Sequence, residues 1–136
     1  MLKILLVEDS KFLRLATERA LARAGYDITS AADGAEALSL AREKLPDLIL
    51  LDMLLPKLSG PDVLKALKSD PATQAIPVVV LTGMSQKNAA RLQNDGALAF
   101  LEKSALALDK GPNHLLNALK EIFRDLPRTQ ARSTSA

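Results

Sequence analysis

Apolar and polar residues follow two patterns that alternate along the chain. Nearly continuous apolar runs occur at residues 2–7, 48–51, 76–82 and 97–101, and a short, partly polar stretch at 26–31 is typical of a strand at the edge of a sheet. Runs of this length are too short for helices, and strands that are apolar on both faces belong mostly to parallel sheets covered by helices. Five stretches between or after them have the periodicity or end signals of helices: residues 11–24, 33–44, 61–69, 85–94 and 113–126. The alternation predicts an α/β fold with a doubly wound, five-stranded parallel sheet.

Residues with specific turn and cap preferences mark where these helices begin and end. Ser10 is expected to be the N-cap of the first helix, and Gly25 follows its last turn. Asp33 and Glu36 have the spacing of a capping box at the start of the second helix. Pro61 is expected at the first position of the third helix, where its missing N–H costs nothing.

Composition narrows the class of protein. The 136 residues are 48% hydrophobic and 25% charged, as in an ordinary globular domain, and the absence of cysteine excludes disulfides and thiolate metal sites. We expect one domain over residues 1–126 and a disordered tail over 127–136, so that output must come from binding. No run approaches the ~20 apolar residues of a membrane span, and acidic residues follow the first strand, which favours a cytoplasmic location. A net charge of +2 and 3% aromatic residues argue against a nucleic-acid partner, and DNA binding through the tail would be weak.

Chemically active side chains follow four of the predicted strands. Glu8 and Asp9 follow the first strand, Asp52 follows the third, Thr82 is the last residue of the fourth, and Lys103 follows the fifth. Parallel strands end at one edge of their sheet, which is where such folds bind ligands. Oxygen ligands without His or Cys suit Mg²⁺, and a lysine and a hydroxyl suit phosphate oxygens. Because an aspartate can carry a phosphoryl group covalently, the set predicts phosphoryl transfer onto a carboxylate.

Four short motifs carry a resemblance to a known family. They are Ile-Leu-Leu-Val-Glu-Asp at 4–9, Asp-Met-Leu-Leu-Pro at 52–56 with Gly60, Val-Leu-Thr-Gly at 80–83, and Phe-Leu-Glu-Lys at 100–103. Over residues 2–126 the sequence resembles the receiver domain of two-component response regulators, the CheY-like family. The resemblance implies a flavodoxin-like sheet of order 2-1-3-4-5. It also implies that Asp52 takes a phosphoryl group from a histidine kinase or a phosphotransfer protein.

The resemblance assigns a role to each residue of the site. The Mg²⁺ ligands, some of them through water, would be Glu8, Asp9, Asp52 and the backbone carbonyl of Leu54. Lys103 and Thr82 would contact the phosphoryl oxygens. Phe100 would turn inward as Thr82 moves, although it fits equally well as a core residue of the last strand. This movement would remodel the face of the fourth helix, fifth strand and fifth helix, which binds an unknown downstream protein and is a candidate surface for a dimer.

Two features depart from the family pattern. Ser104 stands where receivers usually have proline, and the connection 104–112 is longer than usual. Both features affect the direction in which Lys103 points and the shape of the face formed by the fourth helix, fifth strand and fifth helix. Leu54 and Met84 occupy variable positions beside the phosphorylation site. Because large apolar side chains there would hinder an attacking water, we expect a phosphoaspartate that hydrolyses slowly.

The protein would catalyse only its own phosphorylation and dephosphorylation, and would not be an enzyme in the usual sense.

Other functions remain open at this point. A receiver fold can serve as a protein-interaction module without phosphorylation, which the complete set of site residues argues against and Ser104 allows. A Mg²⁺-dependent phosphatase with an aspartate nucleophile needs a second acid two residues further on, where this chain has Leu54. A flavin carrier needs a Ser/Thr/Gly-rich phosphate loop after the first strand, which this chain lacks.

Overall fold

Five parallel strands form the centre of the protein. The computed structural model describes residues 2–52, 60–82, 96–102 and 113–125. Its strands are β1 (Lys3–Val7), β2 (Asp27–Ala31), β3 (Leu48–Asp52), β4 (Val78–Thr82) and β5 (Ala99–Glu102). They pair in the order β2-β1-β3-β4-β5, and every neighbouring pair is parallel. The predicted doubly wound sheet and its strand order are confirmed.

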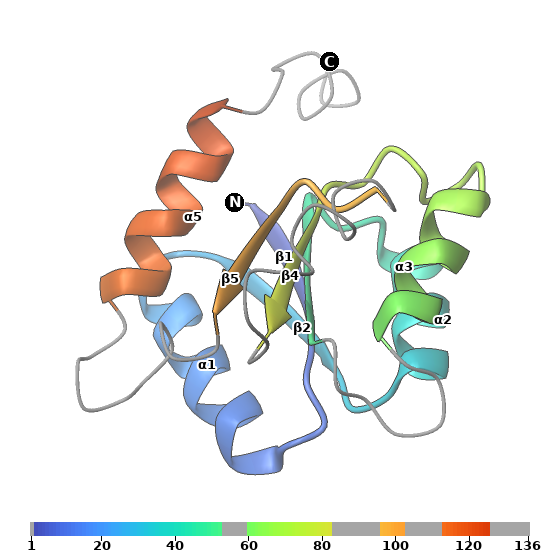
Figure 1. The fold of residues 1–136 in the computed structure, drawn as a ribbon. Helices are drawn as coiled ribbons and strands as arrows, with labels where there is room; N and C mark the ends of the chain where they lie inside the picture. Colours follow the sequence, from blue (N-terminus) through green and yellow to red (C-terminus); the bar gives the residue numbers. More distant parts are fainter. Residues whose placement is uncertain (1, 53–59, 83–95, 103–112, 126–136) are drawn as a thin grey trace.

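Helices cover both faces of this sheet (Figure 1). The described helices are α1 (Lys11–Arg23), α2 (Gly34–Lys44), α3 (Gly60–Ser69) and α5 (Asn113–Asp125). α1 and α5 lie on one face, and α2 and α3 lie on the other. The helix expected at 85–94 and the tail expected at 127–136 lie outside the described residues. No helix in the described part of the chain is long and apolar enough to cross a membrane.

The two cores explain why the central strands are continuously apolar. Leu5 and Val7 of β1 pack with the α2 and α3 side, whereas Ile4 and Leu6 pack with the α1 and α5 side. All five residues of β3 are buried, including its last residue, Asp52. A strand buried on both faces has no polar side, so the usual alternation of apolar and polar residues is lost. β2 is an edge strand and is partly polar, as predicted.

The helix starts follow the predicted caps. Ser10 Oγ accepts a hydrogen bond from the backbone N–H of Leu13 at 3.3 Å. Asp33 Oδ1 accepts from the backbone N–H of Glu36 at 2.9 Å. Glu36 completes the box one residue early, because its Oε1 accepts from the N–H of Ala32 at 2.8 Å. These bonds satisfy N–H groups that the helices leave without intrahelical partners.

The other helix ends agree with the sequence to within one residue. Gly25 has φ +99°, the positive φ that its place after α1 requires. α2 ends at Lys44, and its C-cap is Leu45, a non-glycine residue in the left-handed region with φ +46°, just before Pro46. α3 begins at Gly60, one residue before the expected Pro61.

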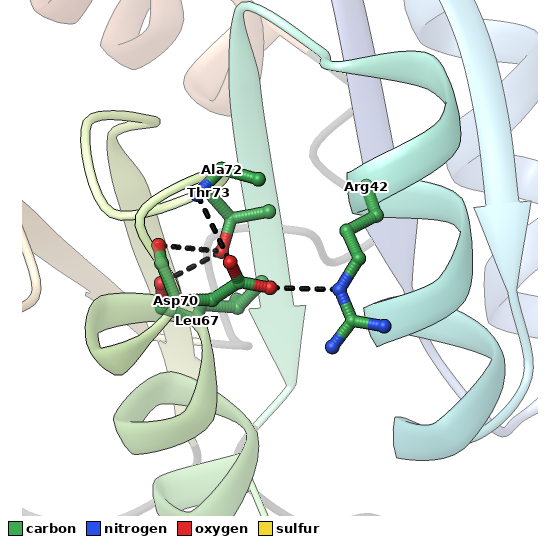
Figure 2. Close-up of polar contacts among 5 residues, drawn as sticks. All are labelled: Arg42, Leu67, Asp70, Ala72 and Thr73. Atoms are coloured by element: carbon green, nitrogen blue, oxygen red, sulfur yellow. Dashed lines mark hydrogen bonds and ion pairs between the residues drawn. The ribbon is translucent and has the colours of Figure 1, made fainter.

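The connection from α3 to β4 is held by polar contacts (Figure 2). Arg42 Nε of α2 donates to Asp70 Oδ2 at 2.7 Å, and Asp70 Oδ1 accepts from the N–H of Ala72 at 2.9 Å. The Thr73 hydroxyl is buried and donates to the carbonyl of Leu67 at 2.7 Å. The Arg42 hydrogen bond is the main reason that the pKa of the Asp70 carboxyl lies below its usual value. These contacts tie α2 to the end of α3.

A lysine of α3 also contacts the connection between α3 and β4. Lys68 Nζ donates to the carbonyls of Gln74 at 3.1 Å and Ile76 at 2.8 Å, and burial lowers the pKa of this ammonium. Its stem lies against Gly96, which has φ +111°. A Cβ atom on Gly96 would lie 2.7 Å from Lys68 Cγ, so this site requires glycine for space as well as for backbone conformation.

Candidate functional site

The carboxyl ends of the two central strands bring the first acidic residues together. β1 and β3 pair in parallel with Val7 beside Leu51. The next residues along the two strands are Glu8 and Asp52, which therefore leave the sheet at the same edge. Asp52 is the last residue of β3, and Glu8 begins the turn into α1. This placement was predicted from the sequence and follows from parallel pairing alone.

Three carboxylates form the core of the site. Glu8, Asp9 and Asp52 each offer an oxygen that lies within 4.8 Å of the other two. Glu8 and Asp52 are buried, with 1% and 0% of their surface exposed, whereas Asp9 is exposed. Two unit charges at this separation repel by about 3 kcal/mol at an effective dielectric constant of about 20. Such a cluster favours a bound cation.

The donor set fits a hard divalent cation. The three carboxylate oxygens lie within 4.8 Å of one another, which is close enough for them to hold one cation, either directly or through bound water. Because all three groups are carboxylates, with no imidazole or thiolate among them, the chemistry of the cluster suits Mg²⁺ better than zinc or copper.

The turn between β1 and α1 is fixed by several hydrogen bonds. The N–H of Glu8 donates to the carbonyl of Ala31 at 3.0 Å, and Glu8 Oε2 accepts from the N–H of Ser10 at 3.0 Å. Arg14 Nη1 donates to the carbonyl of Glu8 at 2.9 Å and lies 3.5 Å from the carbonyl of Asp9. The sequence did not single out Arg14, because its spacing is that of any arginine one turn into a helix.

The remaining predicted residues belong to the two outer strands. Thr82 is the last residue of β4 and pairs with Glu102 of β5, so its backbone lies at the same edge of the sheet as Asp52. Phe100 lies within β5, beside Val80. The other residues that the sequence assigned to the site or its surroundings lie outside the described residues: Leu54, Met84, Lys103 and Ser104.

The chain belongs to the response regulator receiver family. The family model of the response regulator receiver domain matches residues 4–119, which is most of the chain and includes every predicted site residue. The fold, the strand order and the acidic cluster agree with this assignment. The resemblance inferred from the sequence motifs is therefore confirmed, and the protein is a receiver domain of two-component signalling.

Individual relatives agree with the family. Over 101 residues the chain is 37% identical to the polar-differentiation response regulator DivK of Brucella anthropi, a match that covers 74% of this chain and 82% of DivK. It is similar in structure to the chemotaxis response regulator CheY4 of Vibrio cholerae, with TM-score 0.81, 31% identity, and coverage of 90% and 98% of the two chains. It is also similar to the Mn²⁺-bound form of the response regulator Rcp1, with TM-score 0.77, 27% identity, and coverage of 93% and 97%.

Proposed function

We propose that the protein is the phosphoaccepting receiver of a two-component phosphorelay. Asp52 takes a phosphoryl group from the phosphohistidine of a histidine kinase or a phosphotransfer protein, in a reaction that depends on Mg²⁺. The observation that supports this most is the position of Asp52. It ends the central strand β3 and shares the carboxyl edge of the sheet with Glu8 and Asp9, whose oxygens lie within 4.8 Å.

The transfer is a simple displacement at phosphorus. A carboxylate oxygen of Asp52 forms a bond to phosphorus while the bond from phosphorus to the histidine nitrogen breaks, and its electron pair returns to the imidazole ring. Thr82 donates a hydrogen bond to a phosphoryl oxygen, and the Lys103 ammonium places a positive charge beside another. Neither contact forms a covalent bond, so these residues act by positioning and by charge.

A divalent cation is part of the proposed site. Its ligands would be the carboxylates of Glu8, Asp9 and Asp52 and the backbone carbonyl of Leu54. When bound, Mg²⁺ neutralises charge on the carboxylates and on the phosphoryl oxygens. The Mn²⁺-bound form of the similar protein Rcp1 supports a divalent cation in receivers of this fold. The carboxylate-only chemistry of the described cluster supports it independently.

The output of the switch is a change in protein binding. Movement of Thr82 toward the phosphoryl group would let Phe100 turn inward and remodel the face that includes β5 and α5, where a downstream protein binds and where two receivers would pair. Two hydrogen bonds to a charged group contribute roughly 3–6 kcal/mol, which is comparable to the ~5.5 kcal/mol needed to invert a 1:99 equilibrium. We place this switch in the cytoplasm. The same residues make the protein a catalyst of its own modification only.

The phosphoaspartate should persist. Leu54 and Met84 are large apolar residues at positions that flank the phosphorylation site in the family. They would hinder an attacking water without contacting the phosphoryl oxygens. We therefore propose slow hydrolysis, which is measured by following the loss of the label in the absence of a phosphatase. A half-life of seconds would contradict this part of the proposal.

Intact mass spectrometry tests the function directly. The protein is incubated with acetyl phosphate and Mg²⁺, beside Asp52→Asn and a sample with EDTA. In the productive reaction acetate leaves as the new oxygen–phosphorus bond forms, so one phosphoryl group is added to the native chain only. An unmodified mass with acetyl phosphate and with a phosphorylated histidine phosphotransfer protein would overturn the proposal. The better account would then be an interaction module that works without phosphorylation.

A further inference from the structure

We infer that Arg14 is a positioning residue for the metal-binding turn, acting through the backbone on either side of Asp9. This inference rests on the Mg²⁺ site of the proposed function. Arg14 Nη1 donates to the carbonyl of Glu8 at 2.9 Å and lies 3.5 Å from that of Asp9. Its own backbone N–H donates to the carbonyl of Ser10 at 2.8 Å, in the first turn of α1. The side chain therefore links the helix to the turn before it.

The two carbonyls are those of neighbouring peptide units. The Glu8 carbonyl belongs to the peptide plane before the Cα atom of Asp9, and the Asp9 carbonyl belongs to the plane after it. Peptide units are planar, so the orientations of these two planes define φ and ψ of Asp9. A guanidinium near both oxygens restrains both angles, and with them the direction in which the Asp9 side chain leaves the backbone.

Asp9 is the carboxylate that most needs such a restraint. Glu8 is buried, its N–H donates to Ala31, and its carboxylate accepts from the N–H of Ser10. Asp52 is buried at the end of a central strand. Asp9 is exposed and follows the strand by two residues, so its place in the cluster depends on the path of the turn. Arg14 sets that path.

A purely electrostatic role and a positioning role of Arg14 predict opposite changes in Mg²⁺ affinity when Arg14 is replaced. A cation near the cluster repels Mg²⁺, so its removal would strengthen Mg²⁺ binding if charge were its only effect. Loss of a contact that orients a ligand weakens metal binding, typically by 10–100-fold. The direction of the change in Mg²⁺ affinity therefore separates the two roles.

The experiment measures Mg²⁺ affinity by calorimetric titration of the native protein, Arg14→Met, Arg14→Lys and Arg19→Met. Arg19 is an exposed arginine on the same helix and serves as the matched control. We expect Arg14→Met to bind Mg²⁺ about tenfold more weakly. Arg14→Lys should be intermediate, since an ammonium lacks the planar fork of a guanidinium. Arg19→Met should match the native protein.

A second readout needs no metal. Backbone ¹⁵N relaxation of the Mg²⁺-free protein should show lower order at Asp9 in Arg14→Met than in the native protein or in Arg19→Met. Lower order confined to the turn would explain a weaker Mg²⁺ affinity by the loss of its restraint. Overall destabilisation would instead lower the order in many parts of the chain. Melting temperatures recorded alongside establish that each variant is folded.

Each outcome decides one of the two claims. Native-like or tighter Mg²⁺ binding by folded Arg14→Met would overturn the positioning role. Absence of Mg²⁺ binding by the native protein would instead overturn the metal site of the proposed function. If Arg14→Met does not fold, Arg14→Lys, which keeps the charge, takes its place in the comparison, and native affinity in that variant would overturn the inference.

Discussion

The native acidic cluster should destabilise the Mg²⁺-free protein, and Asp52→Asn should relieve this cost. Asp52 is fully buried, and the carboxylates of Glu8 and Asp9 each have an oxygen within 4.8 Å of an Asp52 carboxylate oxygen. Asparagine has nearly the same shape, so the substitution removes one charge with little change in packing. Functional sites commonly trade stability for activity in this way. The variant should be more stable than the native protein and unable to accept a phosphoryl group.

The size of the effect follows from the geometry. Repulsion from the buried Glu8 is about 3 kcal/mol at an effective dielectric constant of about 20. Repulsion from the exposed Asp9 is closer to the value in water, about 1 kcal/mol. The amide loses hydrogen bonding available to a charged acceptor, which offsets roughly 2 kcal/mol of this gain. A net stabilisation of about 2 kcal/mol raises the melting temperature of a domain of this size by roughly 8 °C.

Thermal unfolding with and without Mg²⁺ is the assay. At a Mg²⁺ concentration ten times its Kd, the native protein should gain about 1.4 kcal/mol by mass action. Asp52→Asn keeps only two of the three carboxylates and should gain less, so the difference between the two proteins narrows. Asp27→Asn is the matched control at an exposed aspartate of β2 and should change stability by no more than about 0.5 kcal/mol. A less stable Asp52→Asn without Mg²⁺, or an equal gain with it, would refute the reasoning.

Two further predictions concern the rest of the fold. Gly96→Ala should destabilise the protein by about 2 kcal/mol or more in urea unfolding, because it combines positive φ with a close contact. Gly25→Ala has positive φ but open space and should cost less, and equal costs would contradict the contact. The Arg42 hydrogen bond holds the pKa of Asp70 below its ordinary value. The stability it contributes is therefore present above the unfolded-state pKa of about 3.9, and is lost as pH falls through the folded-state pKa. Asp70→Asn should remove this pH dependence, and an unchanged acid limb would show that the pair contributes nothing.

Much of the fold could be predicted because the chain repeats one simple arrangement. A run such as residues 48–51 belongs at the centre of a covered parallel sheet, since it has no polar face. Once the sheet is parallel, the residues after each strand share one edge. Glu8 and Asp52 are therefore neighbours for topological reasons, and the sequence alone was enough to place them together.

The contacts that depend on an irregular backbone path could not be predicted. Arg14 contacts two main-chain carbonyls, and nothing in residue type or spacing distinguishes it from Arg19. The connection through Asp70 and Thr73 likewise depends on hydrogen bonds to backbone groups whose positions follow from the turn itself. The roles of residues beyond the described ranges, among them that of Lys103, stay predictions.

The most direct test of the central claim is to map the acyl phosphate to a residue. The protein is phosphorylated with acetyl phosphate and Mg²⁺, treated with borohydride, which reduces an aspartyl phosphate to homoserine, and digested for peptide mass spectrometry. The account predicts homoserine at position 52, absent when EDTA replaces Mg²⁺. Homoserine at position 9 would contradict it. So would a chain with no reduced residue after treatment with acetyl phosphate and, separately, with a phosphorylated histidine phosphotransfer protein.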